Sequence, residues 1–203
     1  MSEMTRRTIG IAAAALLAAM SVSFAQQPQT MRIRGPITAV DGSMLTVTAG
    51  EAGPVRVALT DNAAVYGVVK ASLADIKSGV YIGVGATPQP DGSQRAIQIM
   101  IFTEQQRGLG EGHRPWDRPN TTMTNATVDT VVKAVEGDAI LVKYKDGEKK
   151  IVITPETVIR AYLTGSKDDL KPGANISIVR AVGKADGSFE ADRVNVGRDG
   201  IAP

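Results

Sequence analysis

Residues 80–102, VYIGVGATPQPDGSQRAIQIMIF, predict a β-hairpin and with it the fold class of the chain. Two runs in which apolar residues alternate with small or polar ones, Val80–Ala86 and Arg95–Phe102, lie on either side of Pro90-Asp91-Gly92-Ser93. Such alternation is typical of half-buried strands. An Asp-Gly pair between two strands favours the positive φ angles that a tight hairpin turn requires. The stretch therefore indicates antiparallel β structure.

The same pattern recurs 94 or 95 residues later, in Asn175–Val182, Ala185-Asp186-Gly187-Ser188 and Phe189–Val196. A nearly constant spacing between similar segments indicates an internal duplication, here of a module of about 70 residues. We therefore expect two modules of one design. Further matches at this spacing pair Val57–Thr60 with Ile151–Thr154, Ser72–Gly79 with Ser166–Gly173, and Ile37–Gly42 with Val132–Gly137.

Each module also contains further short strands and one helical turn. Ser72–Ile76 and Ser166–Leu170 each place a Ser three residues before an Asp, which is the pattern of a capping box and also accounts for the paired carboxylates at Asp168-Asp169. Short strands with one helical turn in so small a module are typical of OB-type barrels. The predicted fold is all-β, two tandem small OB-like β-barrels that each carry one short helical turn; a pair of small open β-sandwiches is the alternative. The other predicted strands are Met44–Thr48, Val55–Leu59, Ile140–Tyr144 and Lys149–Ile153.

Residues 1–25 have the pattern of a cleaved signal peptide. Arg6 and Arg7 precede the apolar run Ile9–Met20, and Ser23-Phe24-Ala25 supplies the small residues of a cleavage site. The run is shorter than the about 20 apolar residues of a comfortable membrane span. We expect an exported protein, periplasmic in a Gram-negative bacterium, that does not span the membrane once mature. The expected organisation is a signal peptide at 1–25, a first barrel module at 26–102, a connector at 103–125 and a second barrel module at 126–203.

The composition excludes several classes of function. The 23 Lys and Arg residues nearly balance the 21 Asp and Glu residues, whereas nucleic-acid-binding proteins usually carry a strong excess of basic residues. The chain has no Cys, which removes disulfides, thiol nucleophiles and cysteine zinc sites. It has one His and no Gly-x-Ser-x-Gly motif, so the pattern of a serine hydrolase is missing.

The connector, residues 103–125, interrupts the β pattern and holds the single His and the single Trp of the chain. Structureless connections of this length are uncommon inside compact domains and tend to be functional or disordered. In one interpretation Trp116 fills the groove between the barrels, with Arg and Asp side chains paired over it. In the other the connector crosses a barrel mouth and presents polar side chains to a ligand. The candidate ligand-binding residues are Glu111, His113, Arg114, Trp116 and Asp117.

Three of these candidates could instead hold one divalent metal ion. Glu111 and Asp117 offer carboxylate oxygens and His113 offers one imidazole nitrogen, a set that suits Mn²⁺ or Zn²⁺. A metal site needs three or four converging ligands, and the spacing here matches no established metal motif. No other cofactor is indicated by the sequence.

Three stretches of the chain resemble a family of uncharacterised exported bacterial proteins, of unknown function, that are built from small β-barrel modules. They are Gly35–Gly42, Gly108–Asp117 (GLGEGHRPWD) and Thr122–Val128 (TMTNATV). The similarity extends over nearly the whole mature chain. Some members of that family are labelled metal ABC transporter permease. A permease requires several membrane-spanning helices, so the resemblance implies at most a soluble accessory of a transporter.

The sequence thus predicts a soluble, exported, non-catalytic binding module. Its partner would be a small ligand, a glycan or another envelope protein. The alternative is a metal-handling accessory protein of an envelope transporter, which would depend on Glu111, His113 and Asp117. A hydrolase with a carboxylate-based site is the third hypothesis.

Overall fold

The computed structural model describes residues 29–132 and 138–203, and within them the chain is all-β. The predicted signal peptide at 1–25 lies outside the described residues, as do residues 133–137. In the described part of the chain, no helix is both long and apolar enough to cross a membrane. The helical elements described are short 3-10 turns: η2 (Gly50–Ala52), η3 (Leu73–Asp75), η4 (Glu104–Gln106) and η5 (Lys167–Asp169).

Five strands close the first barrel: β1 (Thr30–Asp41), β2 (Met44–Thr48), β3 (Pro54–Lys70), β11 (Asn175–Gly183) and β12 (Phe189–Gly197). Each strand pairs with the next in the order β1-β2-β3-β12-β11, and β11 returns to β1. All neighbours are antiparallel except β3 and β12, which are parallel. The inward-facing residues, among them Ile33, Val57 and Val194, form one apolar core.

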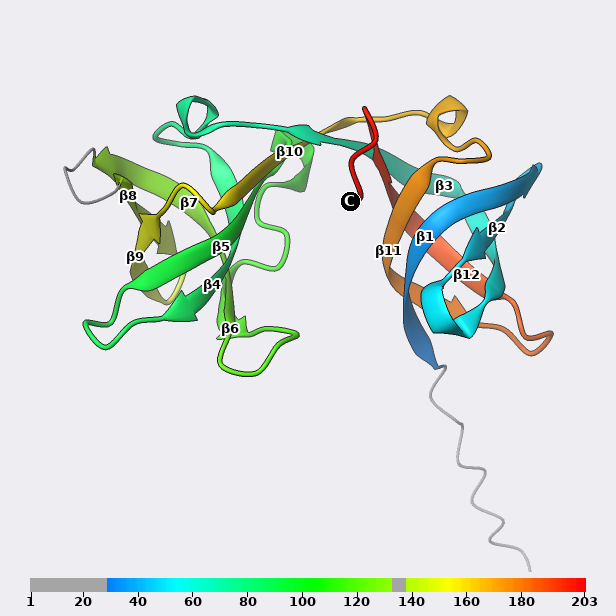
Figure 1. Ribbon diagram of the computed structural model, residues 1–203, viewed down its shortest axis with the longest axis horizontal. Coiled ribbons are helices and arrows are strands. Elements are labelled where there is room, and N and C mark those ends of the chain that lie inside the picture. Colours follow the sequence, from blue (N-terminus) through cyan, green and yellow to red (C-terminus); the bar gives the residue numbers. More distant parts are fainter. Residues whose placement is uncertain (1–28, 133–137) are drawn as a thin grey trace, which may run out of the picture.

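Five other strands close the second barrel in the same way: β4 (Tyr81–Pro88), β5 (Gln94–Ile101), β7 (Thr122–Val132), β8 (Asp138–Tyr144) and β9 (Gly147–Ile153). The order is β7-β8-β9-β5-β4 and back to β7, and the one parallel pair is β9 with β5. Ile82, Ile99 and Ile140 lie in its core, which is separate from that of the first barrel. Figure 1 shows the two barrels side by side.

Each barrel is assembled from two distant parts of the chain, which differs from the contiguous modules expected at 26–102 and 126–203. The first barrel joins β1, β2 and β3 to the hairpin β11–β12, and the second joins β7, β8 and β9 to the hairpin β4–β5. The two hairpins from which the β class was predicted are both present. Each of them, however, belongs to the barrel whose other three strands lie in the other half of the chain.

The length of β3 explains this arrangement. The sequence predicted a strand only at Val55–Leu59, but β3 runs for 17 residues, from Pro54 to Lys70. Its first part pairs with β2. Its last part pairs with β12 of the first barrel on one edge and, at Tyr66–Lys70, with β10 (Val158–Thr164) on the other. The following turn and hairpin, η3 and β4–β5, therefore fall in the second barrel. β10 carries the chain back in the opposite direction, as Figure 1 shows between the barrels.

The two crossing strands pair symmetrically. Val68 pairs with Tyr162, which lies 94 residues further along the chain, and the pairs Lys70–Arg160 and Tyr66–Thr164 flank it on either side. The register therefore reads the same from either strand, as at the two-fold axis of a symmetric dimer. Val68 is fully buried there, and the Tyr162 ring packs 5.9 Å from Tyr66 and 5.5 Å from Phe102, measured between ring centroids. The crossing is thus a packed junction.

The first strands of the two barrels correspond differently from the sequence match. We expected Ile37 to correspond to Val132, but Ile37 pairs with Val47 just as Val128 pairs with Val142. Ile37 and Val128 are both about 1% exposed, and each exchanges two backbone hydrogen bonds with the segment before the exchanged hairpin. Val132 is 50% exposed. The sequence match was therefore displaced by four residues from the structural correspondence. The buried positions, Ile37 and Val128, identify the true register.

Local turns form where their sequences predicted them. The Asp75 and Asp169 carboxylates accept hydrogen bonds from the backbone N–H of Ser72 and Ser166, at the start of η3 and η5. These hydrogen bonds lower the pKa of both Asp side chains. The paired carboxylates at 168–169 are therefore part of a cap, as the capping-box pattern predicted.

Candidate functional site

The connector packs on the outer face of the second barrel. It contains η4 and a short strand, β6 (Gly112–Pro115), that pairs antiparallel with β7, and its last four residues belong to β7 itself. Tyr81 Oη on β4 donates a hydrogen bond to the carbonyl of Leu109, and Asn125 Nδ2 on β7 donates to the same carbonyl at 2.9 Å. The long connection is therefore folded against a sheet surface.

Trp116 lies against β4 at a position where only glycine leaves room for it. A Cβ atom added at Gly85 would lie 2.6 Å from the nearest atom of the indole ring. The ring is partly buried, and the backbone N–H of Trp116 donates to the carbonyl of Thr121. Trp116 thus fills space on the surface of the second barrel, at β4.

Asp117 connects the two barrels. Its carboxylate pairs with the Arg32 guanidinium on β1 of the first barrel. Arg114 does not take part in this pair, since its guanidinium donates a 2.7 Å hydrogen bond to the carbonyl of Gly110 within the connector. These two charged candidates are therefore already engaged with other parts of the chain.

Glu111 and His113 lie near the hairpin β8–β9. The Glu111 carboxylate accepts a hydrogen bond from the backbone N–H of Lys145, and His113 Nδ1 lies 2.8 Å from the Thr124 hydroxyl. The His113 ring stacks on Tyr144 with 6.5 Å between ring centroids. Burial, and then the positive charge of Lys149, lower the pKa of His113, so the imidazole is neutral at pH 7.

The five candidates do not converge on one point, and the three expected metal ligands each contact a different part of the chain. Asp117 faces Arg32, whereas Glu111 accepts a backbone hydrogen bond near the β8–β9 hairpin. Among residues 29–132 and 138–203, no group of three His, Cys, Asp or Glu side chains is placed to hold a metal ion. The set Glu111, His113 and Asp117 therefore has no metal-site geometry in the described chain.

A pocket of about 510 Å³ lies instead at the crossing of β3 and β10. Its residues come from both halves of the chain and from the C-terminal segment, so the pocket exists only because the strands cross. We call it the crossing pocket. It is lined by Lys70, Ala71, Val158, Ile159, Arg160 and the segment Asp199–Ala202.

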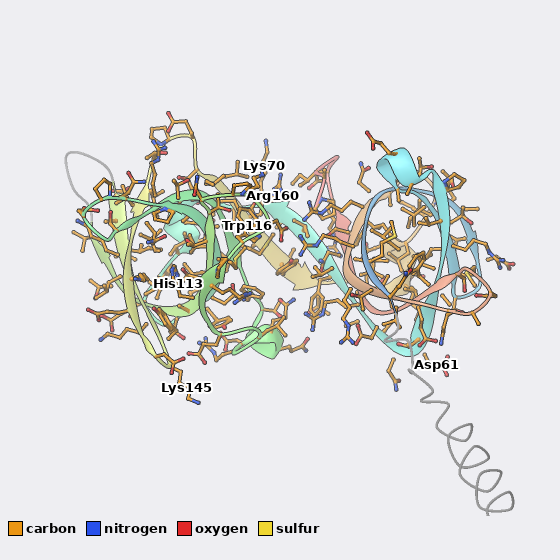
Figure 2. The ribbon with its side chains drawn as sticks, turned by 90° about the horizontal axis from the view of Figure 1, so that it is seen from below. Asp61, Lys70, His113, Trp116, Lys145 and Arg160 are labelled. Carbon is orange, nitrogen blue, oxygen red and sulfur yellow. The ribbon has the colours of Figure 1, made fainter. Side chains whose placement is uncertain are left out.

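Two cations meet at this pocket. Lys70 and Arg160 are directly opposite each other in the antiparallel pair, and Figure 2 shows them side by side where the barrels meet. Like charges at directly opposite positions destabilise a strand pair. Within the described residues neither side chain takes part in an ion pair, although Asp199 also lines the pocket.

The lining of the crossing pocket combines two cations with one carboxylate. Asp199 is the only carboxylate among the lining residues, and the lining includes no His, Ser, Thr or Tyr side chain. A second hollow, of about 490 Å³, has its Arg198 guanidinium paired with Asp169 at 3.0 Å. Its charges are thus already compensated.

Sequence reasoning missed Lys70 and Arg160 because neither belongs to a motif and they are 90 residues apart. The available signal was the alternation in Val158–Thr164, which would have predicted the second crossing strand. Comparison of the chain with protein-family models, with curated proteins and with solved structures gives no match, so its function is inferred from geometry alone.

Proposed function

We propose that this protein is an exported, non-catalytic binding protein whose ligand occupies the crossing pocket. The observation that carries the proposal is the pocket itself, about 510 Å³ in volume and lined by two cations and several apolar residues. Ligand pockets in proteins typically measure about 300–1,000 Å³ and combine an apolar lining with a few polar groups. The lining holds no His, Ser, Thr or Tyr, so hydrolysis in this pocket would have to rely on Asp199 and Lys70 alone.

The architecture is part of the same proposal. We infer that the two barrels are OB-type units that descend from one duplicated module and have exchanged their C-terminal hairpins. Two features support this: both barrels have the same strand order with one parallel pair, and η3 and η5 precede corresponding hairpins. Exchange would serve binding because it places residues from both modules at one junction.

Export is supported by the sequence pattern at residues 1–25 alone, and its test is cleavage in the cell. Mass spectrometry of protein from a periplasmic extract should give a chain that begins at Gln26. A chain that retains Met1 and stays in the cytoplasmic fraction would contradict export without affecting the binding proposal.

The binding proposal is tested by thermal unfolding of residues 26–203 against a panel of small organic acids, sugars, amines and divalent metals. A ligand at 100 times its dissociation constant stabilises a protein by about 2.7 kcal/mol, which raises the melting temperature of a chain this size by about 5–10 °C. We expect such a rise with an organic compound, and its loss when Ala71 is replaced by Trp to fill the pocket.

The same panel addresses the metal alternative. A selective rise with Mn²⁺ or Zn²⁺ that disappears in His113→Ala, and is unaffected by Ala71→Trp, would replace our proposal with the metal-handling accessory. No rise with any organic compound at millimolar concentration would contradict binding in the crossing pocket.

A further inference from the structure

We propose that the crossing pocket selects a small organic anion, a carboxylate or phosphate ester that also carries an apolar group. This inference rests on the proposed binding function and adds the chemical class of the ligand. Three features of the described residues support it: an uncompensated pair of cations, the asymmetry of their placement, and an apolar surface beside them.

The cation pair is costly unless an anion joins it. Lys70 and Arg160 are register partners on neighbouring strands, and their charges repel. In the described chain neither side chain forms an ion pair with a carboxylate. A bound carboxylate or phosphate would bridge the ammonium and the guanidinium, and Arg in particular presents parallel N–H donors to such groups.

The placement of these cations does not follow from the symmetry of the crossing. The positions that correspond to Lys70 and Arg160 at the other end of the crossing strands are Thr164 and Tyr66, which are also register partners. That end therefore carries no cation pair. Two cations at register-partner positions therefore occur only at the end where the crossing pocket lies, whereas a single guanidinium, that of Arg193, lies over the Tyr66 ring at the other end.

The remaining lining explains why the anion should carry an apolar group. Val158 is 45% exposed, and Ala71 and Ile201 also line the pocket. An exposed Val next to other apolar side chains is stabilised when an apolar group covers it. Asp199, which also lines the pocket, would repel a second negative charge and so favours a ligand with a single anionic end.

The experiment follows the backbone amide resonances of residues 26–203 by NMR during titration with phenyl phosphate. Benzyl alcohol serves as a neutral compound that carries the same phenyl group. We expect phenyl phosphate to shift the amides of residues 70–71, 158–160 and 199–202, and benzyl alcohol to shift them weakly or not at all.

Variants then test the two cations. Lys70→Gln and Arg160→Gln should each weaken phenyl phosphate binding about tenfold or more, the usual effect of removing one hydrogen bond to a charged group. Lys167→Gln, an exposed lysine on η5, is the matched control and should bind as the unaltered chain does. Since removal of either cation relieves repulsion, the unliganded Lys70→Gln and Arg160→Gln chains should melt no lower than the unaltered chain.

The outcomes separate this inference from the proposed function. Equal shifts at the pocket with both compounds, or binding that survives in both Gln variants, would overturn the anion class and leave the pocket as a binding site. No shift at the pocket amides with either compound, or shifts scattered over exposed lysines elsewhere, would overturn the anion class and remove support from the proposed function as well.

Discussion

The packing of Trp116 against Gly85 of β4 predicts a measurable loss of stability in Trp116→Ala. The indole ring touches the backbone of Gly85 and is partly buried on the second barrel. A fully buried Trp replaced by Ala costs about 3–5 kcal/mol, and partial exposure reduces that to about 2–3 kcal/mol. For a chain of this size the melting temperature should fall by about 5–10 °C.

A companion variant separates packing from any direct role in binding. Gly85→Ala leaves the indole in the chain but places a Cβ atom 2.6 Å from it, so the ring must move away from the barrel. Because Trp116 is the only Trp, its fluorescence reports that movement directly. We expect emission at longer wavelength in Gly85→Ala and a melting temperature between those of the unaltered chain and Trp116→Ala.

The assays are thermal unfolding by circular dichroism and fluorescence emission of the folded state. Trp116→Phe, which keeps an aromatic ring of smaller size, is the control and should lose less than half of the stability lost in Trp116→Ala. The reasoning would be refuted if Trp116→Ala melted within 1 °C of the unaltered chain, or if Gly85→Ala left the emission unchanged.

Two further predictions concern single side chains. Gly35→Ala should destabilise the first barrel by at least about 2 kcal/mol in urea unfolding. Gly35 has φ +151°, and an added Cβ would overlap the Thr48 carbonyl oxygen. A loss below about 0.5 kcal/mol in that measurement would contradict this packing. Because the pKa of His113 is lowered from 6.5 in the folded chain, the folded state binds this proton less readily than the unfolded state. Stability should therefore fall as the pH drops below about 6.5 and through the lowered folded pKa. His113→Gln should show a smaller decline of melting temperature between pH 7.5 and pH 5, and an identical decline would contradict the assignment.

Local sequence patterns predicted the local structure well. The hairpins at 80–102 and 175–196, the strand Met44–Thr48 and the two capped turns all form where alternation, Asp-Gly pairs and Ser-x-x-Asp spacing placed them. These signals depend on neighbouring residues alone, so one stretch of sequence is enough to read them.

The choice of partner for each hairpin could not be predicted in the same way. The hairpins β4–β5 and β11–β12 occupy corresponding places, so either would offer a similar apolar face to either barrel. What decides between them is that β3 continues through Val65–Lys70 into a second pairing, and this depends on contacts with β10 more than 90 residues away. Periodicity within one module carries no information about such contacts.

Sequence and structure point to different candidate sites for a related reason. The ligand-binding residues were predicted in the connector because it holds the only His and the only Trp of the chain. The rarity of a residue type, however, does not distinguish a packing role from a binding role. Trp116 and Asp117 are used to hold the connector and the barrels together. Lys70 and Arg160, by contrast, look ordinary in sequence and become notable only through their register.

The exchange of hairpins is tested most directly by two pairs of engineered cysteines, since the chain has none of its own. Ala58 on β3 is the register partner of Glu190 on β12, and adjacent strand positions lie within the about 4.4–6.8 Å Cα separation that a disulfide spans. If each module instead closed its own barrel, Ala58 would pair with Arg95, which occupies the corresponding place on β5.

The measurement is the extent of disulfide formation under mild oxidation, read by mass spectrometry of the intact folded chain. The exchanged architecture predicts rapid and complete bonding in the variant that combines Ala58→Cys with Glu190→Cys, and none within one molecule in the variant that combines Ala58→Cys with Arg95→Cys. Bonding in the second variant and not in the first would contradict the exchange, and with it the crossing pocket that depends on it.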